Sequence, residues 1–206
     1  EEFEDCGSIW VKGSKFLIPN LIGDQIYKNL LTQLNLNHSD FENKHKKHYN
    51  KKFHSLFSLG IFRMAPCDYH RFHSPISGTI IDMNEIDGEL NSCSPIVINK
   101  DVNVLTENRR YIIMIDTDNC GIMCIVYIAS FMVGSCVFND NIKIGSDITI
   151  KQEMGSFKFG GSTVILIVQK DRIQFDKDII KSSLQNTETY VNCAEKIGET
   201  KIIDHF

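Results

Sequence analysis

Two patterns of apolar and polar residues follow one another along the chain. Between residues 18 and 34, apolar residues recur at spacings of three and four, which predicts a short helix with one apolar face, interrupted near Gly23. Residues 177–198 also have a helical pattern. Helices are therefore expected in only a small part of the chain.

From residue 58 onward, short runs rich in β-branched residues alternate with turns that contain Gly, Pro, Asn and Asp. The expected strands are 59–64, 79–83, 96–98, 111–116, 123–132, 142–150 and 164–169. Short strands joined in this way are typical of antiparallel sheets. The predicted fold class is mainly β (α+β): an antiparallel β sandwich or partly closed barrel with a few peripheral helices.

The composition limits the classes of function. The 206 residues, of which 42% are hydrophobic, fit one domain over residues 1–206 with a substantial core. The 22 Lys and Arg against 26 Asp and Glu argue against nucleic-acid binding, because such domains concentrate positive charge. The longest apolar stretch, 122–133, is shorter than the ~20 residues that span a bilayer.

Residues 35–54 differ from the rest of the chain and form a low-complexity basic insert. Five lysines and three histidines lie between residues 43 and 54. One interpretation is a solvated loop. Another is a basic patch that attracts anionic lipid headgroups, and a third is metal binding by the histidines.

Seven cysteines lie in apolar surroundings without a CxxC pair. This pattern favours reduced, mostly buried thiols over a disulfide framework or a zinc site. We therefore expect no bound metal.

Two segments could carry chemistry. The first, DYHRFHSP at 68–75, places His70 and His73 beside an arginine and two aromatic residues. Histidine is well suited to proton transfer near neutral pH, although a structural pair at a turn is the alternative.

The second segment places Gly160 and Gly161 before Ser162, at the start of an apolar strand. Glycines leave the backbone open, so the Ser162 hydroxyl can approach the preceding carbonyl; a simple hairpin turn is the alternative. The segment is neither a Walker loop nor a GxSxG elbow. A third segment, 139–157, looks like the hairpin of a lipoyl or biotin carrier, but Lys151 is a poor match for the modified lysine.

Together these stretches resemble the phosphatidylserine decarboxylase family, which is pyruvoyl-dependent. The matching motifs occur in family order: WVKG (10–13), LIGD (21–24), RMAP (63–66), DYHRFHSPISG (68–78), VLTENRR (104–110), VGS (133–135), MGSFKFGGST (154–163), IQFD (173–176) and EKIG (195–198). The GGST form and the WxKG segment are similar to the type II branch.

The resemblance implies a self-processing zymogen. Ser162 would attack the carbonyl of Gly161, and the chain would be cleaved between these two residues, leaving a covalent pyruvoyl group in place of Ser162 as the cofactor. Residues 1–161 would become the β subunit and residues 162–206 the α subunit. The pyruvoyl group would act as the electron sink that decarboxylation requires.

The resemblance also implies residue roles. His73 would activate Ser162 for self-cleavage, His70 would serve decarboxylation, and Tyr69 and Phe72 would contact substrate. The family's third self-cleavage residue is an aspartate in an upstream motif that this chain does not contain, so we expect the chain to be N-terminally truncated.

The implied reaction is that of a carboxy-lyase in phospholipid biosynthesis, which converts phosphatidylserine into phosphatidylethanolamine and CO2. We expect a peripheral enzyme of anionic membranes, in the endomembrane system or at the mitochondrial inner membrane. Residues 43–54 and apolar side chains of 17–34 would contact the lipid. The α and β chains would form a heterodimer, with a homodimer as an option.

Two alternatives stay open. One is a pyruvoyl-dependent decarboxylase of a soluble amino acid. The other is an uncleaved, inactive homologue that binds membranes.

Overall fold

The computed structural model describes residues 8–11, 14–34, 57–93, 103–131, 136–158 and 162–201. The basic insert 35–54, the expected strand 96–98, the VGS motif and Gly161 lie outside the described residues.

The centre of the molecule is a six-stranded antiparallel sheet in the order β3-β11-β7-β6-β5-β9. Its strands are β3 (Phe57–Met64), β5 (Gly78–Ile86), β6 (Arg110–Thr117), β7 (Gly121–Ile128), β9 (Asp147–Ile148) and β11 (Ser162–Gln169). A second antiparallel sheet, in the order β4-β10-β8, contains β4 (Arg71–His73), β8 (Cys136–Phe138) and β10 (Glu153–Phe157). The sheets are open, so the predicted sandwich is confirmed and the barrel is not formed.

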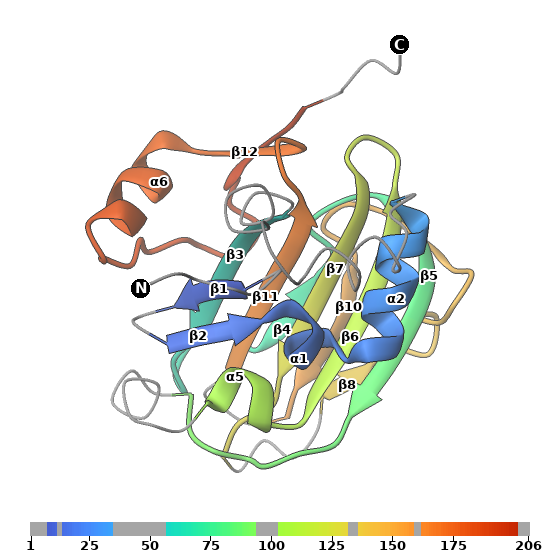
Figure 1. Ribbon diagram of the computed structural model, residues 1–206, viewed down its shortest axis with the longest axis horizontal. Coiled ribbons are helices and arrows are strands. Elements are labelled where there is room, and N and C mark those ends of the chain that lie inside the picture. The colour runs from blue at the N-terminus through green and yellow to red at the C-terminus, as the bar shows by residue number, and fades with distance from the viewer. Residues whose placement is uncertain are drawn as a thin grey trace, which may run out of the picture.

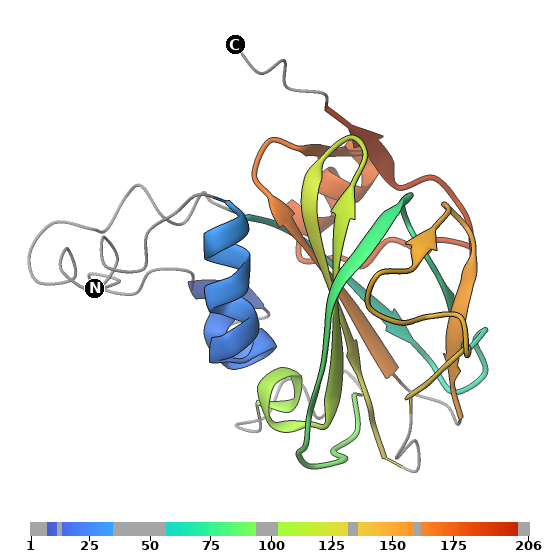
Figure 2. The same ribbon diagram turned by 90° about the vertical axis from the view of Figure 1, so that its right-hand side faces the viewer.

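The helices α1 (Ile18–Ile22) and α2 (Asp24–Gln33) cover one face of the central sheet, and the three-stranded sheet covers the other (Figure 2). The remaining described elements are the hairpin of β1 (Ser8–Val11) and β2 (Ser14–Leu17), α5 (Val104–Glu107), α6 (Lys177–Leu184), and the pair β12 (Ile173–Phe175) and β13 (Gly198–Thr200) (Figure 1).

Both faces of the central strands are buried, which explains their nearly continuous apolar sequence. In β11, Ile165 and Ile167 belong to the core between sheet and helices, whereas Leu166 and Val168 belong to the core between the sheets. Successive side chains of a strand point to opposite faces. Burial of each Leu or Ile side chain contributes roughly 1.5–3 kcal/mol to the free energy of unfolding. The two cores therefore hold the helices, the central sheet and the three-stranded sheet together.

The predicted N-terminal helix is confirmed, including its break at Gly23, whose φ of +82° suits glycine. Its apolar residues are almost fully buried: Ile18, Leu21, Ile22, Ile26, Leu30 and Leu31. The expectation that apolar residues of this helix contact lipid is therefore wrong, because they pack against the protein's own sheet.

Two other expectations need correction. The predicted strand 142–150 is mostly turn around Gly145, whose φ is +85°, and only Asp147–Ile148 pairs with β5. The predicted helical segment 177–198 ends at Leu184, and α6 has no buried residue. Within the described ranges, no helix is long and apolar enough to cross a bilayer.

Candidate active site

Ser162 is the first residue of β11 and lies opposite Met64 of β3. Its side chain is completely buried, and its Oγ has no hydrogen-bond partner among the described residues. Leaving a buried hydroxyl unpaired costs about 1–3 kcal/mol, and such a group in a native structure calls for an explanation. Ser162 is therefore kept as a candidate nucleophile.

The alternation along β11 gives the direction of this hydroxyl. Ser162 and Leu166 are an even number of residues apart on β11, so their side chains lie on the same face of the sheet, and Leu166 faces the core between the two sheets. The side chain of Ser162 therefore faces the layer that contains β4 and β10. Thr163 faces the opposite layer.

The histidine segment lies beside the end of β10. The backbone N–H of Phe157, at the end of β10, donates to the carbonyl of His70 at 2.9 Å. Five residues later the same chain reaches Ser162, which lies opposite Met64. Because five residues span at most roughly 18 Å, Ser162 lies no farther than that from the end of β10.

The ring of His70 is oriented by its own turn. Nδ1 lies 2.6 Å from the backbone oxygen of Asp68, and the Asp68 carboxylate accepts from the N–H of Ala65 at 2.7 Å. A carbonyl oxygen can only accept, so Nδ1 of His70 carries the proton. In the neutral ring, Nε2 then holds the lone pair.

His73 lies opposite Glu153 of β10 and is partly buried. The ring of Tyr69 stacks on it with centroids 5.7 Å apart, and Cys193 places its Sγ 3.9 Å from Nδ1. Burial, followed by the nearby Cys193 and Glu153, raises the pKa of Tyr69. Arg71 forms an ion pair with Glu153.

The two aromatic residues expected to bind substrate differ. Tyr69 is 50% exposed beside His73. Phe72 is 6% exposed and packs against Tyr127 and Phe157 in the core. Tyr69 thus has surface available for a substrate, whereas Phe72 is a core residue.

Ser162 faces the layer that contains β4 and His73, but the described residues show no hydrogen bond from Ser162 to the ring of His70 or His73. Gly161, the other residue of the expected cleavage site, lies outside the described residues. Cys193 was missed because nothing near it in sequence links it to His73, 120 residues away.

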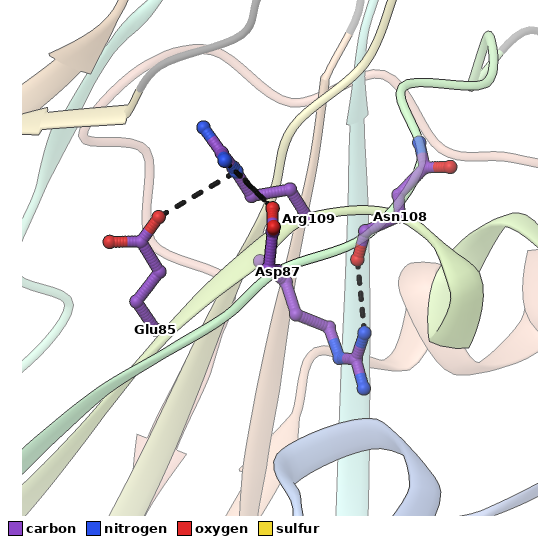
Figure 3. Close-up of polar contacts among 5 residues, drawn as sticks. Glu85, Asp87, Asn108 and Arg109 are labelled. Atoms are coloured by element: carbon purple, nitrogen blue, oxygen red, sulfur yellow. Dashed lines mark hydrogen bonds and ion pairs between the residues drawn. The ribbon is translucent and has the colours of Figure 1, made fainter.

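The VLTENRR motif has an architectural role (Figure 3). Asn108 is fully buried; its amide nitrogen donates to the carbonyls of Asn91 and Ala129, both at 2.7 Å. The buried guanidinium of Arg110 donates to three backbone carbonyls, those of Asn20, Leu21 and Asn108.

Burial lowers the pKa of Arg110. Its contacts with the carbonyls of Asn20 and Leu21 attach α1 to the central sheet. Arg109 points outward and pairs with Asp87 at 2.7 Å and Glu85 at 3.6 Å (Figure 3). Two adjacent arginines therefore differ in role, which the sequence motif did not indicate.

Comparison with known proteins adds an independent observation. The family model described as "Phosphatidylserine decarboxylase" matches residues 1–199. The chain is 37% identical over 205 residues to phosphatidylserine decarboxylase proenzyme 2 of Saccharomyces cerevisiae, covering 98% of this chain and 16% of the relative. It is 38% identical over 197 residues to proenzyme 2 of Oryza sativa, covering 95% of this chain and 27% of the relative.

A bacterial relative, the phosphatidylserine decarboxylase proenzyme of Chlamydia trachomatis serovar L2, is 38% identical over 142 residues, which is 69% of this chain and 46% of the relative. The chain thus spans less than half the length of each of these relatives. The family match nevertheless extends over nearly all of its residues, including both histidines and Ser162. The chain belongs to the phosphatidylserine decarboxylase family.

Proposed function

We propose that the protein is a self-processing carboxy-lyase that converts phosphatidylserine into phosphatidylethanolamine and CO2. The observation that carries the proposal is the buried, unpartnered hydroxyl of Ser162, at the start of β11 and facing the layer that bears the histidines. The named relatives are proenzymes, which is consistent with a precursor that must be processed.

Self-cleavage begins at Ser162. Its Oγ attacks the carbonyl carbon of Gly161, the amide between the two residues becomes an ester, and the amine stays on residue 162. β-Elimination breaks the Cβ–Oγ bond, releases Gly161 as a carboxylate and leaves dehydroalanine. Water then replaces the nitrogen, which leaves as ammonia, and residue 162 becomes a pyruvoyl group.

His73 is the proposed base that accepts the Ser162 hydroxyl proton. A serine hydroxyl is a weak nucleophile at neutral pH, so a positioned base is required. Tyr69 and Cys193 restrict the ring of His73, which favours a fixed orientation for proton transfer. The proposal requires the ring to approach Ser162 when cleavage occurs.

The residues around Ser162 fit a pyruvoyl group. The site is buried, and its hydroxyl forms no hydrogen bond within the described residues that would have to break before the reaction. When formed, the pyruvoyl group supplies a carbonyl that accepts the electrons left by the departing carboxylate. His70, oriented by the backbone oxygen of Asp68, is the proposed group that returns a proton to the substrate carbon.

The lipid substrate implies access from a membrane surface. We place the protein at an anionic membrane as a peripheral protein, with residues 43–54 of the basic insert as its proposed contact, in the endomembrane system or at the mitochondrial inner membrane. Because the buried face of α2 contacts the sheet, the basic insert carries this role without the helix.

The test uses full-length protein and vesicles of phosphatidylserine in phosphatidylcholine, with phosphatidylethanolamine measured by mass spectrometry. We expect product from the wild-type protein and none from Ser162→Ala. Release of CO2 from free aromatic amino acids, with none from vesicles, would favour a decarboxylase of soluble amino acids. A single uncleaved chain without turnover would favour the inactive membrane-binding homologue.

A further inference from the structure

The helix α6 carries apolar and basic residues on the face that points away from the protein. Four of its residues follow one another at spacings of three and four and so form this outer face: Lys177, Ile180, Lys181 and Leu184. All four are exposed, and Leu184 is 80% exposed. Ile179 and Ser182, on the opposite face, are partly buried. The helix therefore turns two of its three large apolar residues toward solvent.

This arrangement is unusual for a short helix. An isolated helix of eight residues is marginal in water, and helices of proteins gain most of their stability by packing an apolar face. None of the residues of α6 is buried. Figure 1 shows α6 beyond β3, the edge strand of the central sheet. The outer face is therefore a candidate for contact with another surface.

Contacts on both sides hold α6 in this position. The N–H of Asp176, just before the helix, donates to the carbonyl of Ile197 at 2.9 Å. Glu188, four residues after the helix, forms an ion pair with Arg63 of β3 at 3.1 Å. Tyr190 follows and is 83% exposed, which adds an aromatic side chain with a polar tip next to the helix.

The charges indicate which surface covers the outer face. Its two lysines accompany Ile180 and Leu184, whereas Asp178 is on the flank of the helix, and Asp176 and Glu188 lie outside it. Such a face suits the boundary of a bilayer, because lysine side chains reach the lipid phosphates while their apolar neighbours enter the hydrocarbon. In a symmetric dimer through the same face, the lysines of two copies would repel one another. An anionic bilayer is therefore favoured over a second copy.

The segment after α6 also reaches the proposed active site. Cys193, nine residues beyond Leu184, places its Sγ 3.9 Å from Nδ1 of His73. We propose that α6 is a membrane contact whose outer face binds the surface of an anionic bilayer. This inference rests on the proposed function, in which the substrate is a membrane lipid. It adds a contact on the future α subunit to residues 43–54 of the future β subunit.

Flotation of full-length protein with vesicles of phosphatidylserine in phosphatidylcholine tests this contact. We expect Ile180→Ser combined with Leu184→Ser to weaken vesicle binding about tenfold or more, because two apolar side chains no longer enter the bilayer. Lys177→Gln combined with Lys181→Gln should weaken binding about tenfold at low salt and little at high salt. All four side chains are exposed, so thermal unfolding and self-cleavage should match the wild type.

The chain offers a matched control elsewhere on its surface. Ile144 and Ile150 are 59% and 57% exposed, in the turns on either side of β9. Ile144→Ser combined with Ile150→Ser removes two exposed isoleucines that are not part of α6. Vesicle binding of this variant should stay within about twofold of the wild type. Equal weakening by both pairs of substitutions would overturn the role of α6.

A tryptophan in place of Leu184 reports on the contact directly. Trp10 is the single tryptophan of the chain, so Leu184→Trp is made together with Trp10→Phe. Its fluorescence emission should shift to shorter wavelength when phosphatidylserine vesicles are added, because the indole leaves water. The emission of Ile144→Trp in the same background should not shift.

Three results would contradict the proposals in different ways. Unchanged flotation after substitution of Ile180 and Leu184, or an unshifted emission at position 184, would overturn the membrane contact. A wild-type dimer that these substitutions convert into monomers in sedimentation, with vesicle binding unchanged, would assign the outer face to a second copy. Vesicle binding through α6 without any production of phosphatidylethanolamine would overturn the proposed function and not the contact, so the two failures are distinguishable.

Discussion

At the residue scale, the site depends on groups whose surroundings differ sharply over short distances. Ser162 is buried and its hydroxyl has no hydrogen-bond partner among the described residues, while the ring of His70 contacts the Asp68 carbonyl and that of His73 lies beside Cys193. Evolution tolerates an unpaired buried polar group where its reactivity is used. The three residues stay predictions from the sequence, which could not predict that Phe72 faces the core, because strand direction depends on pairing with β10.

Substitution of each histidine should affect a different step of the reaction. His73→Ala should block self-cleavage, because Ser162 loses its base. His70→Ala should permit some cleavage yet lose decarboxylation, because its proposed role comes after maturation. Gels and vesicle turnover measure the two steps, and equal losses in both steps for both variants would refute this division of roles.

Two adjacent arginines provide a second test at this scale. Arg110→Met should lower the free energy of unfolding by about 2–4 kcal/mol, because three backbone carbonyls, two of them in buried contacts, lose their charged donor. Arg109→Met removes an exposed ion pair and should have a much smaller effect. Urea unfolding compares the variants, and equal losses would contradict the architectural role of Arg110.

At the element scale, long strands were easier to predict than short ones. The strands β3, β5, β6, β7 and β11 follow from runs of apolar residues, because each run is long enough to show its pattern. The strands β4, β8 and β10 have three to five residues and form by pairing with one another, which no local pattern encodes. His73 lies on β4, and β10 precedes the proposed cleavage site, so no local pattern indicated how these parts are arranged.

Gly155 tests how β10 is held. A Cβ at this position would lie 2.2 Å from the carbonyl oxygen of Val137 and 2.9 Å from the ring of Phe72. Gly155→Ala should therefore displace β10 and destabilise the protein by about 2–4 kcal/mol. It should also slow self-cleavage, since β10 leads to the cleavage site.

Gly145→Ala is the control. No atom lies within 4 Å of an added Cβ there, so only the φ of +85° opposes the substitution, at a cost of about 1 kcal/mol. Thermal unfolding and the gel assay serve both variants. A Gly155→Ala protein as stable as Gly145→Ala would show that β10 tolerates the displacement.

At the scale of the whole molecule, the proposed cleavage divides the chain but not the layers. After cleavage, β11 would begin the α subunit while remaining between β3 and β7 of the β subunit. The ladders on both sides and the buried residues of β11 hold the two chains together (Figure 1). The division into subunits is implied by family resemblance, and the pairing of β11 with strands on both sides would hold such a heterodimer together.

The two chains should therefore remain associated after maturation. A tag on either one should recover both in native buffer, and denaturant should separate them. The Ser162→Ala precursor, as a single chain, serves as the reference. Recovery of a tagged chain without its partner in native buffer would contradict this account of β11.

The central claim is that Ser162 cleaves its own chain and becomes the catalytic carbonyl. Its most direct test is the intact mass of full-length wild-type protein and of Ser162→Ala. We predict two wild-type chains, of which the smaller is lighter by one ammonia than a chain that begins with serine, and a single chain for the variant. Cleavage between residues 161 and 162 in the variant, or a small wild-type chain that begins with unmodified serine, would contradict the account.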